Sequence, residues 1–543
     1  MRRIVLLLVP ILIAACSISP ATQQVIETAT KIPSPSAAST TFPTPTNTAT
    51  PQPRYTPLSY GPDFEDFPEN INPLTGLVVS DPSLLNLPAV LVSISNMPFT
   101  ARPQAGPGFA PWVYELYIGE GATRFMNVFY GQYPRSIPNI TGSCAVRDEI
   151  FYPAKEWIGN RVWFDENANG IQDDWETGVG GVCIRLLDAV SREVLKETST
   201  DSNGYYAFDA PGKDVIVQLT QLDAYEITSA NIGDEDHDSD VDSKGELRIP
   251  ANSPGSFWDA GLILNKGARA TPDPSATATP WYIPTEDYVG PIRSGRLTYN
   301  QIGRMFPNSC LVYASAAWDI GEMLDACEIV FGVDKTTPNS ALLPVTRLRE
   351  LAEENLNPRQ PVNYSGNLFS HEIPSDGKTA ENIHVFYHAY TQSAWEYNPV
   401  SQSYLRWTDL ADGTGTLTPA IDRLSQRQMS FENVIVLFAE HNRYRHNQLE
   451  IDFTMGQKSY AWLFRDGQAF KIFWSTENRE FEKQTGLVRP MHFVDAKGNP
   501  IALHPGRTWI HIVTPYSTVA EKEAGNWLVN FVQPYDPEDT PAP

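Results

Sequence analysis

The segment from Asp165 to Glu176 is the stretch that most constrains this chain. Oxygen-bearing side chains stand at its positions 1, 3, 5, 9 and 12, and a glycine stands at position 6, where a sharp turn is needed. The predicted ligands are Asp165, Asn167, Asn169, the backbone carbonyl of Ile171, Asp173 and Glu176. Calcium is a hard cation that takes about six to eight oxygen ligands. The spacing therefore predicts a loop that wraps one calcium ion.

The start of the chain has the form of an export signal. A basic N-terminus precedes the apolar run 4–13, which leads into Ala14, Ala15 and Cys16. The run is too short for a membrane span, and small residues suit a cleavage site. A cysteine at this place resembles a bacterial lipobox, which implies cleavage and lipidation of Cys16; the alternative is an ordinary secretory signal with a chance cysteine. We expect a lipid-anchored protein outside the cytoplasm, and the sequence does not distinguish inner from outer membrane.

Two segments rich in Pro and Thr, 17–57 and 265–285, offer few side chains for a core and are predicted to be disordered linkers. The expected organisation follows from them. In chain order it is an export signal (1–16), a linker (17–57), the first part of an N-terminal domain (58–155), an all-β insert (156–264), a linker (265–285), the second part of the N-terminal domain (286–375), a C-terminal domain (376–515) and a tail (516–543).

The acidity of the chain is local. Its formal net charge is −24, and residues 156–264 hold 22 acidic and 7 basic residues, which leaves −15 in that segment alone. Such a concentration suits cation binding. It argues against nucleic acid as a partner, because phosphates are bound by basic patches.

Four cysteines besides Cys16 allow three complete pairings, which the sequence does not distinguish: Cys144, Cys183, Cys310 and Cys327. Export permits disulfides. We favour a Cys310–Cys327 bridge and expect Cys183, in an apolar run, to be a buried thiol.

The acidic segment has the pattern of a β-sandwich, with short alternating runs at 161–164, 182–187, 205–208 and 215–219 separated by turn signals. The motifs Gly159-Asn160-Arg161-Val162-Trp163, Asp201-Ser202-Asn203-Gly204-Tyr205 and Asp259-Ala260-Gly261 surround the calcium loop. Together they closely resemble the SdrD-type B domain of bacterial surface proteins. The resemblance implies an immunoglobulin-like sandwich, stiffened by calcium, that serves as a spacer rather than as a catalyst.

A second acidic run could hold further ions. Alternating aspartates would share one face if this stretch were a strand, and their repulsion would then favour a cation. They are Asp234, Asp236, Asp238, Asp240 and Asp242. The alternative is a solvated acidic loop. Asp201 and Asn203 are expected to be turn formers.

The flanking sequence contains the motifs Ile71-Asn72-Pro73-Leu74-Thr75-Gly76, Gly290-Pro291-Ile292-Arg293-Ser294-Gly295-Arg296 and Leu503-His504-Pro505-Gly506-Arg507. In this order they resemble the YerB-type lipoprotein family, whose domain has no known function. It implies that the sandwich is inserted into the first domain of a host, which requires host ends that lie close together. We therefore expect strand 124–130 to be a neighbour of the Gly290 segment. The amphipathic helix 344–354 and strands at 433–438, 460–464 and 508–513 predict an α+β host with a β-rich C-terminal part.

The host has candidate ligand-binding residues in loop-like settings: Arg102, Gln104, Arg124, Arg293 and Arg296. Guanidinium groups suit carboxylates and phosphates. The alternative is an internal salt-bridge network with Glu115 or Glu120. Relatives usually carry a histidine after the strand that corresponds to 311–316; its absence here favours binding over catalysis.

We therefore expect a structural or recognition protein of the envelope that binds peptidoglycan, another wall polymer or a surface protein. The main alternative is a hydrolase of wall polymers that uses Glu115 or Glu120 as its acid/base, with the arginines holding an anionic substrate. A third hypothesis, adhesion to other cells, depends on the sandwich alone.

Overall fold

The computed structural model describes most of the chain after residue 58. The described residues are 59–79, 81–134, 157–173, 176–201, 204–220, 222, 225–255, 257–264, 287–332, 339–398, 401–425, 427–445, 448–453 and 458–534. Cys16, Cys144, Asn203 and the predicted linkers 17–57 and 265–285 lie outside them. No helix in the described part is long and apolar enough to span a bilayer.

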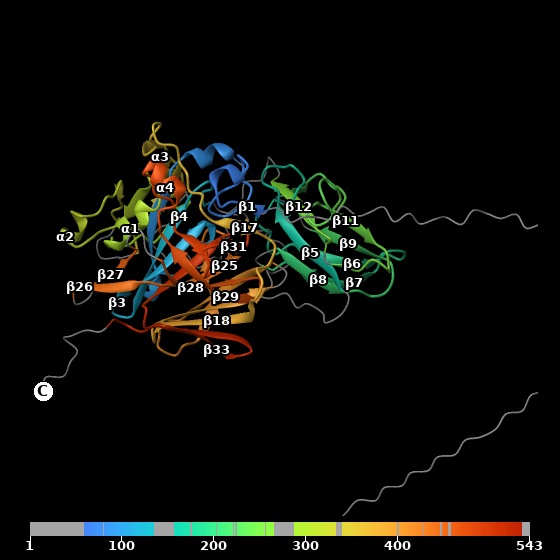
Figure 1. Ribbon diagram of the computed structural model, residues 1–543. Helices are drawn as coiled ribbons and strands as arrows, with labels where there is room; N and C mark the ends of the chain where they lie inside the picture. Colours follow the sequence, from blue (N-terminus) through green and yellow to red (C-terminus); the bar gives the residue numbers. More distant parts are fainter. Residues whose placement is uncertain are drawn as a thin grey trace, which may run out of the picture. The chain divides into compact units, whose positions relative to one another are not determined.

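The acidic segment folds as two four-stranded sheets (Figure 1). One sheet has the order β10-β12-β5-β8 and the other has the order β11-β9-β6-β7. Their strands are β5 (Trp157–Phe164), β6 (Cys183–Asp188), β7 (Val194–Ser199), β8 (Tyr205–Asp209), β9 (Val215–Thr220), β10 (Tyr225–Ile227), β11 (Glu246–Ile249) and β12 (Ala260–Leu264). Alternate residues such as Ile184 and Leu186 enter one core between the sheets. The predicted immunoglobulin-like sandwich is confirmed.

The body is built on one large sheet. Its pairings give the order β15-β14-β2-β4-β3-β32-β25-β28-β29-β30. The strands are β2 (Val90–Ser95), β3 (Trp112–Gly119), β4 (Ala122–Phe129), β14 (Cys310–Tyr313), β15 (Glu328–Ile329), β25 (Asn433–Phe438), β28 (Lys458–Arg465), β29 (Gln468–Ser475), β30 (His492–Val494) and β32 (Thr508–Val513). Strands from both sides of the sandwich segment thus share this sheet.

A second layer of strands is joined to the first through β18 and β29. It has the order β33-β34-β18-β19-β20, and β20 also pairs with β21 and β24. The strands are β18 (Lys378–His388), β19 (Thr391–Asn398), β20 (Ser403–Asp409), β21 (Leu417–Pro419), β24 (Ser430–Phe431), β33 (Thr518–Glu523) and β34 (Gly525–Asn530). Smaller pairings join β1 (Ser59–Tyr60) to β17 (Leu368–Ser370) and β31 (Ala502–Leu503), β13 (Tyr288–Val289) to β16 (Leu343–Pro344), β22 (Ile421–Asp422) to β23 (Arg427–Gln428), and β26 (Glu440–Arg445) to β27 (Gln448–Asp452).

Helices are short and few in the described residues. They are α1 (Thr298–Arg304), α2 (Trp318–Gly321), α3 (Val345–Glu354) and α4 (Glu480–Thr485), with 3-10 turns η1 (Phe64–Asp66), η2 (Pro82–Asn86), η3 (Phe99–Ala101) and η4 (Pro107–Phe109). The amphipathic helix predicted at 344–354 is confirmed as α3, which buries Leu348, Leu351 and Ala352. The body is an α+β fold in which strands dominate.

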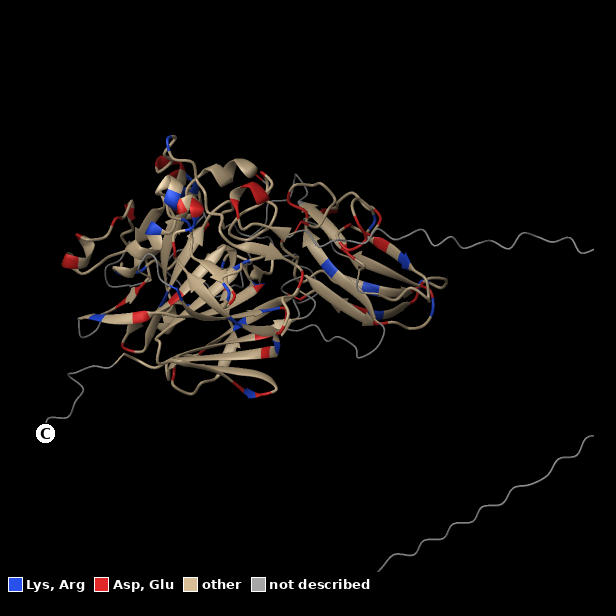
Figure 2. Ribbon diagram, in the orientation of Figure 1, with Lys and Arg blue, Asp and Glu red and all other residues tan. Residues whose placement is uncertain are grey.

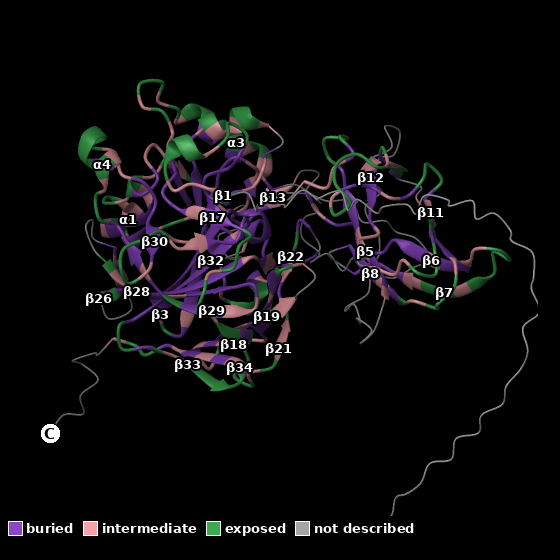
Figure 3. Ribbon diagram, turned by 45° about the vertical axis from the view of Figure 1, so that its right-hand side comes forward, coloured by how far each residue is buried: buried purple, intermediate pink, exposed green. Residues whose placement is uncertain are grey.

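Both faces of the large sheet are covered, as the purple strands of Figure 3 show. Side chains alternate between faces along a strand, and β2 shows the result. Val90 and Val92 enter one core cluster, whereas Ala89 and Leu91 enter the other. A strand buried on both faces reads as a continuous apolar run, and this explains why 89–92 contains no polar residue.

The chain re-enters the body beside β2 after the sandwich segment. Ile292 bridges Ile94, and the backbone N–H of Arg293 donates to Ser93 O over 2.9 Å. On its other edge, β2 pairs with β4, with Ser95 opposite Arg124. The Gly290 segment and β4 therefore lie on opposite edges of β2. One strand separates the two segments that the sequence analysis expected to be neighbours.

Two cysteine expectations can be compared with the structure. Cys310 and Cys327 are joined by a disulfide with a Cα–Cα distance of 5.3 Å, so the favoured bridge is confirmed. Cys183 is also disulfide-bonded, so the prediction of a free buried thiol is wrong. An apolar strand position is equally suitable for either form, because a half-cystine is as apolar as a buried thiol.

Removing the Cys310–Cys327 bridge is expected to destabilise the body by about 3 kcal/mol, because it closes a loop across a sequence separation of 17 residues. The measurement is urea unfolding of the paired Cys310→Ala, Cys327→Ala variant. Because a reductant also breaks the bridge at Cys183, the control compares wild type and variant that are both treated with reductant, and these two should unfold alike. Equal midpoints for oxidised wild type and variant would contradict the expectation.

Candidate functional site

The five predicted ligand-binding residues of the body separate into two groups. Arg102 lies in an internal network, where its ion pair with Asp409 measures 3.0 Å and leaves both side chains buried. Its Nε donates to Asn96 Oδ1 over 3.1 Å, and Gln104 Nε2 donates to the same oxygen over 3.2 Å. Arg102 and Gln104 thus fit the alternative of an internal network rather than contact with a ligand.

The other three arginines lie around two hydroxyl groups, those of Ser294 and Ser95. Ser294 Oγ accepts from Arg124 Nη1 over 3.3 Å and from Arg296 Nη1 over 3.2 Å. Arg293 Nε donates to Ser95 Oγ over 3.0 Å, and Ser95 stands opposite Arg124 in the sheet. We call Arg124, Arg293 and Arg296 the arginine cluster. Arg124 is 169 positions from Arg293 in the chain. The two come together because β4 and the Gly290 segment both pair with β2.

The arginine cluster carries uncompensated positive charge. Within the described residues, no carboxylate lies within 4.0 Å of any of its three guanidinium groups. Glu450 is the acid that interacts with Arg296 at longer range, and its carboxylate accepts from Thr298 Oγ1 over 3.0 Å and from the Leu297 N–H over 3.3 Å. The carboxylate of Glu450 is therefore engaged with the start of α1.

Arg124 is the most enclosed member of the arginine cluster, with 7% of its surface exposed. Burial, together with the charges of Arg296 and Arg293, lowers the pKa of Arg124 to about 10. The Nε atoms of Arg124 and Arg296 are buried and have no hydrogen-bond partner in the described structure. A buried cation with an unsatisfied donor is costly. An oxyanion among these groups would accept several charge-assisted hydrogen bonds and offset that cost.

The two glutamates of the hydrolase alternative have different surroundings. Glu115 is 1% exposed and accepts from Thr123 Oγ1 over 2.8 Å and from Trp509 Nε1 over 3.1 Å. Glu120 is an exposed residue in the turn between β3 and β4, at φ 51°. A general acid must reach the bond that it protonates. The sealed carboxylate of Glu115 therefore gives the hydrolase alternative no geometric support.

Glu115 belongs instead to a buried polar centre that the sequence analysis did not find. Arg406 Nη2 lies 3.4 Å from Glu115 Oε2, and His511 Nδ1 lies 3.4 Å from the same oxygen. Trp395 Nε1 donates to His511 Nε2 over 2.8 Å, and Trp395 is a fully buried core residue. Burial lowers the pKa of His511 well below its usual value, which keeps it neutral. A basic residue inside an apolar strand, as at Arg406 and His511, is the signal that could have revealed this centre.

The calcium loop in the sandwich contains the predicted donor types. Asp165 and Glu176 are 1% and 2% exposed. Asp165 accepts from the N–H groups of Asn169 and Gly170, and Glu176 accepts from those of Glu166 and Asp173. Gly170 has φ +80°, and a Cβ there would lie 2.8 Å from Ser229 O, so the sharp turn requires glycine.

The electrostatics of the loop favour a cation. Burial and the neighbouring charge of Asp165 raise the pKa of Glu176 to about 9. Asn167 and Asn169 both donate their side-chain N–H to Asp173 Oδ2. No group of three or more His, Cys, Asp and Glu side chains in the described residues is arranged to hold a metal. To bind calcium, the loop would therefore need its amide and carbonyl oxygens as well as its carboxylates. Calcium takes a mixed shell of such oxygens, so the donor types of the loop fit the ion.

The second acidic run is a loop, not a strand, so its five aspartates do not share a face. Asp234, Asp236 and Asp242 are exposed, whereas Asp238 is buried and its Oδ1 has no partner in the described structure. Asp240 Oδ2 accepts from the Asp259 N–H over 2.6 Å. Figure 2 marks many acidic residues of the sandwich in its loops. Asp201 Oδ1 accepts from the Tyr205 N–H over 2.9 Å, as a turn former does.

Comparison with known proteins assigns both parts of the chain. A model of the SdrD B-like domain matches residues 156–262. Models of the N-terminal and C-terminal domains of a protein of unknown function, DUF3048, match 74–156 and 383–510. The chain is thus similar to DUF3048 domains on both sides of a segment similar to the SdrD B-like domain. The expectation of a YerB-like body that carries an SdrD-type B domain is confirmed.

Individual relatives share only parts of the chain. Serine-aspartate repeat-containing protein D of Staphylococcus aureus (strain Newman) is 34% identical over 142 residues, which are 26% of this chain and 10% of that protein. Protein F of Staphylococcus epidermidis is 29% identical over 180 residues, 32% of this chain and 10% of that protein. The chain thus spans about one tenth of the length of these relatives. The structure of YerB from Bacillus subtilis aligns over 82% of this chain and 96% of its own, with 15% identity and a TM-score of 0.43.

Proposed function

We propose that this protein is a lipid-anchored recognition protein of the cell envelope, whose DUF3048 body binds an anionic group of a wall polymer at the arginine cluster. The observation that supports this function is the arginine cluster: Arg124 and Arg296 share Ser294, Arg293 lies beside them on Ser95, and no carboxylate lies within 4.0 Å in the described residues. The export signal and Cys16 support the envelope location. A shared SdrD B-like domain supports a surface module that spaces or stiffens.

Calcium is part of this proposal. Asp165, Asn167, Asn169, Asp173 and Glu176 would hold the ion with the carbonyl of Ile171, and the ion would supply the positive charge that two buried carboxylates need. The role assigned to it is structural: a loop cross-linked by an ion resists bending and unfolding. The run around Asp238 is a weaker candidate for a further ion.

Arg293→Gln and Arg296→Gln are each expected to lower the affinity for purified wall material about tenfold, because a charge-assisted hydrogen bond contributes roughly 1.5–3 kcal/mol. The assay is sedimentation of the full chain with peptidoglycan before and after removal of its phosphate-containing polymers. Binding should also weaken as salt is raised. Arg349→Gln, at an exposed arginine paired with Glu353, is the matched control.

Three outcomes distinguish the alternatives. Equal binding by folded Arg293→Gln and Arg296→Gln proteins would contradict the anion site. Soluble fragments released from the wall in the same assay, and lost in Glu120→Gln, would make the protein a hydrolase. Neither binding nor release would leave a surface protein as the partner.

A further inference from the structure

A groove of about 600 Å³ lies in the body, lined by residues of β25, β26, β28, β29 and β33 and of the segments before β26 and β33. Six of its residues carry the argument: Glu440, Tyr460, Trp462, Lys471, Trp474 and Thr518. None of them belongs to the arginine cluster or to the buried centre around Glu115. The volume falls in the range of about 300–1,000 Å³ that is typical of small-ligand sites.

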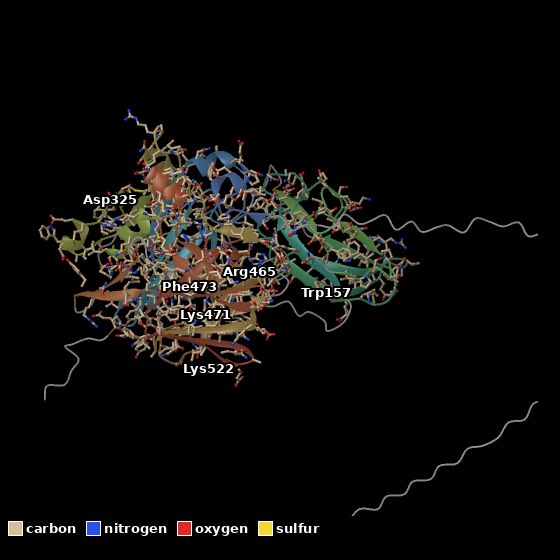
Figure 4. All side chains as sticks on the ribbon, viewed as in Figure 1. Trp157, Asp325, Arg465, Lys471, Phe473 and Lys522 are labelled. Carbon is tan, nitrogen blue, oxygen red and sulfur yellow. A yellow bond between two sulfur atoms is a disulfide. The ribbon has the colours of Figure 1, made fainter. Side chains whose placement is uncertain are left out.

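Aromatic rings form one wall of the groove. Tyr460 and Trp462 are two positions apart on β28, so they share a face, and they stand opposite Phe473 and Lys471 on β29. The Tyr460 and Phe473 rings lie 4.9 Å apart, and Lys471 Nζ lies 4.9 Å from the centre of the Tyr460 ring. Figure 4 labels Lys471 and Phe473 close together on their strand.

The rings are held in place and differ in exposure: Trp474 is fully buried, Trp462 is half-buried and Tyr460 is exposed. Trp462 packs against Trp527, with ring centres 4.9 Å apart, and Trp474 donates its Nε1–H to Phe438 O over 2.8 Å. Tyr460 nevertheless remains 53% exposed. Cross-strand pairing would explain the contacts among the rings. Cross-strand pairing alone does not explain why an aromatic surface faces water beside a groove of this size.

Polar groups surround the aromatic wall. Glu440 and Lys471 have no ion-pair partner within 4.0 Å in the described residues, and Ser459 and Thr518 add hydroxyl groups. One acid and one base leave the rim without net charge. This contrasts with the arginine cluster, which suits an anion. A ligand with apolar faces and uncharged hydrogen-bonding edges matches the groove, and a neutral sugar ring has this form.

We propose that this groove binds a neutral oligosaccharide, with its sugar faces on Tyr460 and Trp462 and its hydroxyl groups on Glu440, Lys471 and Thr518. The groove makes this protein a glycan binder at a place separate from the proposed anion site. The proposal does not depend on the arginine cluster, and each can fail without the other.

The test is calorimetric titration of the full chain with two neutral probes, chitotetraose and cellotetraose. Wild type should show saturable binding of at least one probe. Tyr460→Ala should weaken that binding at least tenfold, because a stacking residue carries much of such an interface. Trp462→Ala should do the same, but Tyr460→Ala is the cleaner variant because its ring is more exposed.

Two control variants separate the possible sites. Trp318→Ala removes an aromatic ring that is 79% exposed and does not line the groove, and it should leave the affinity unchanged. Arg296→Gln should also leave sugar binding unchanged. No saturable binding of either probe, or equal affinity in wild type and Tyr460→Ala, would overturn the proposal. Loss of affinity for a proline-rich peptide alone in Tyr460→Ala would make the groove a peptide site instead.

Discussion

Glu115→Ala is expected to destabilise the body by about 3–5 kcal/mol, because it leaves a buried cation without its counter-charge. Arg406 is 1% exposed, and its guanidinium lies 4.5 Å from the centre of the Trp509 ring and 5.1 Å from that of Phe125. Burial lowers the pKa of Arg406, and the charge of Glu115 opposes that shift. Alanine would also leave the Trp509 N–H and the Thr123 hydroxyl without an acceptor.

The measurement is urea unfolding of the body, monitored by circular dichroism. Removing both charges, as in Glu115→Leu with Arg406→Met, should recover much of the loss, since a buried pair replaced by apolar residues is often nearly neutral. The resulting double-mutant cycle isolates the pairwise energy. Glu120→Ala, at an exposed turn, is the control and should change stability by less than about 0.5 kcal/mol. A Glu115→Ala protein as stable as wild type would show that the centre is hydrated or otherwise compensated.

Removal of calcium is expected to lower the stability of the sandwich by about 4 kcal/mol when free calcium is a thousandfold above its Kd. For a domain of this size, the fall in Tm would be on the order of 20 °C. The sandwich has its own core, so calorimetry of the full chain should show a transition that moves with calcium and another that does not.

Matched variants locate the effect at the loop. Asp165→Asn and Glu176→Gln should abolish the calcium response of the sandwich. Asp209→Asn should keep it, because that exposed carboxylate pairs with Lys196 rather than facing the loop. Identical transitions in calcium and in chelator, with no calcium retained by the protein, would remove calcium from the proposed function.

Patterns within one element or one turn were the most predictable parts of this protein. The helix at 344–354, the strands at 433–438 and 508–513 and the sharp turn at Gly170 follow from spacing that local geometry imposes. The YerB-type and SdrD-type resemblances are also carried by short motifs, and both match the family comparisons. The acidic run at 234–242 shows the limit of this approach, since alternation alone did not make it a strand.

The sequence by itself determined the two kinds of domain, the oxygen donors of the predicted calcium loop and the positive charge of the candidate arginines. Only the tertiary structure decided which arginines meet. Arg124 and Arg293 meet because two distant segments pair with β2, whereas Arg102 turns to Asp409. It also decided that Glu115 is sealed between Arg406 and His511, and that aromatic side chains form a groove at Tyr460. These outcomes depend on register between strands far apart in the chain, and a shift of one residue would turn each side chain to the opposite face.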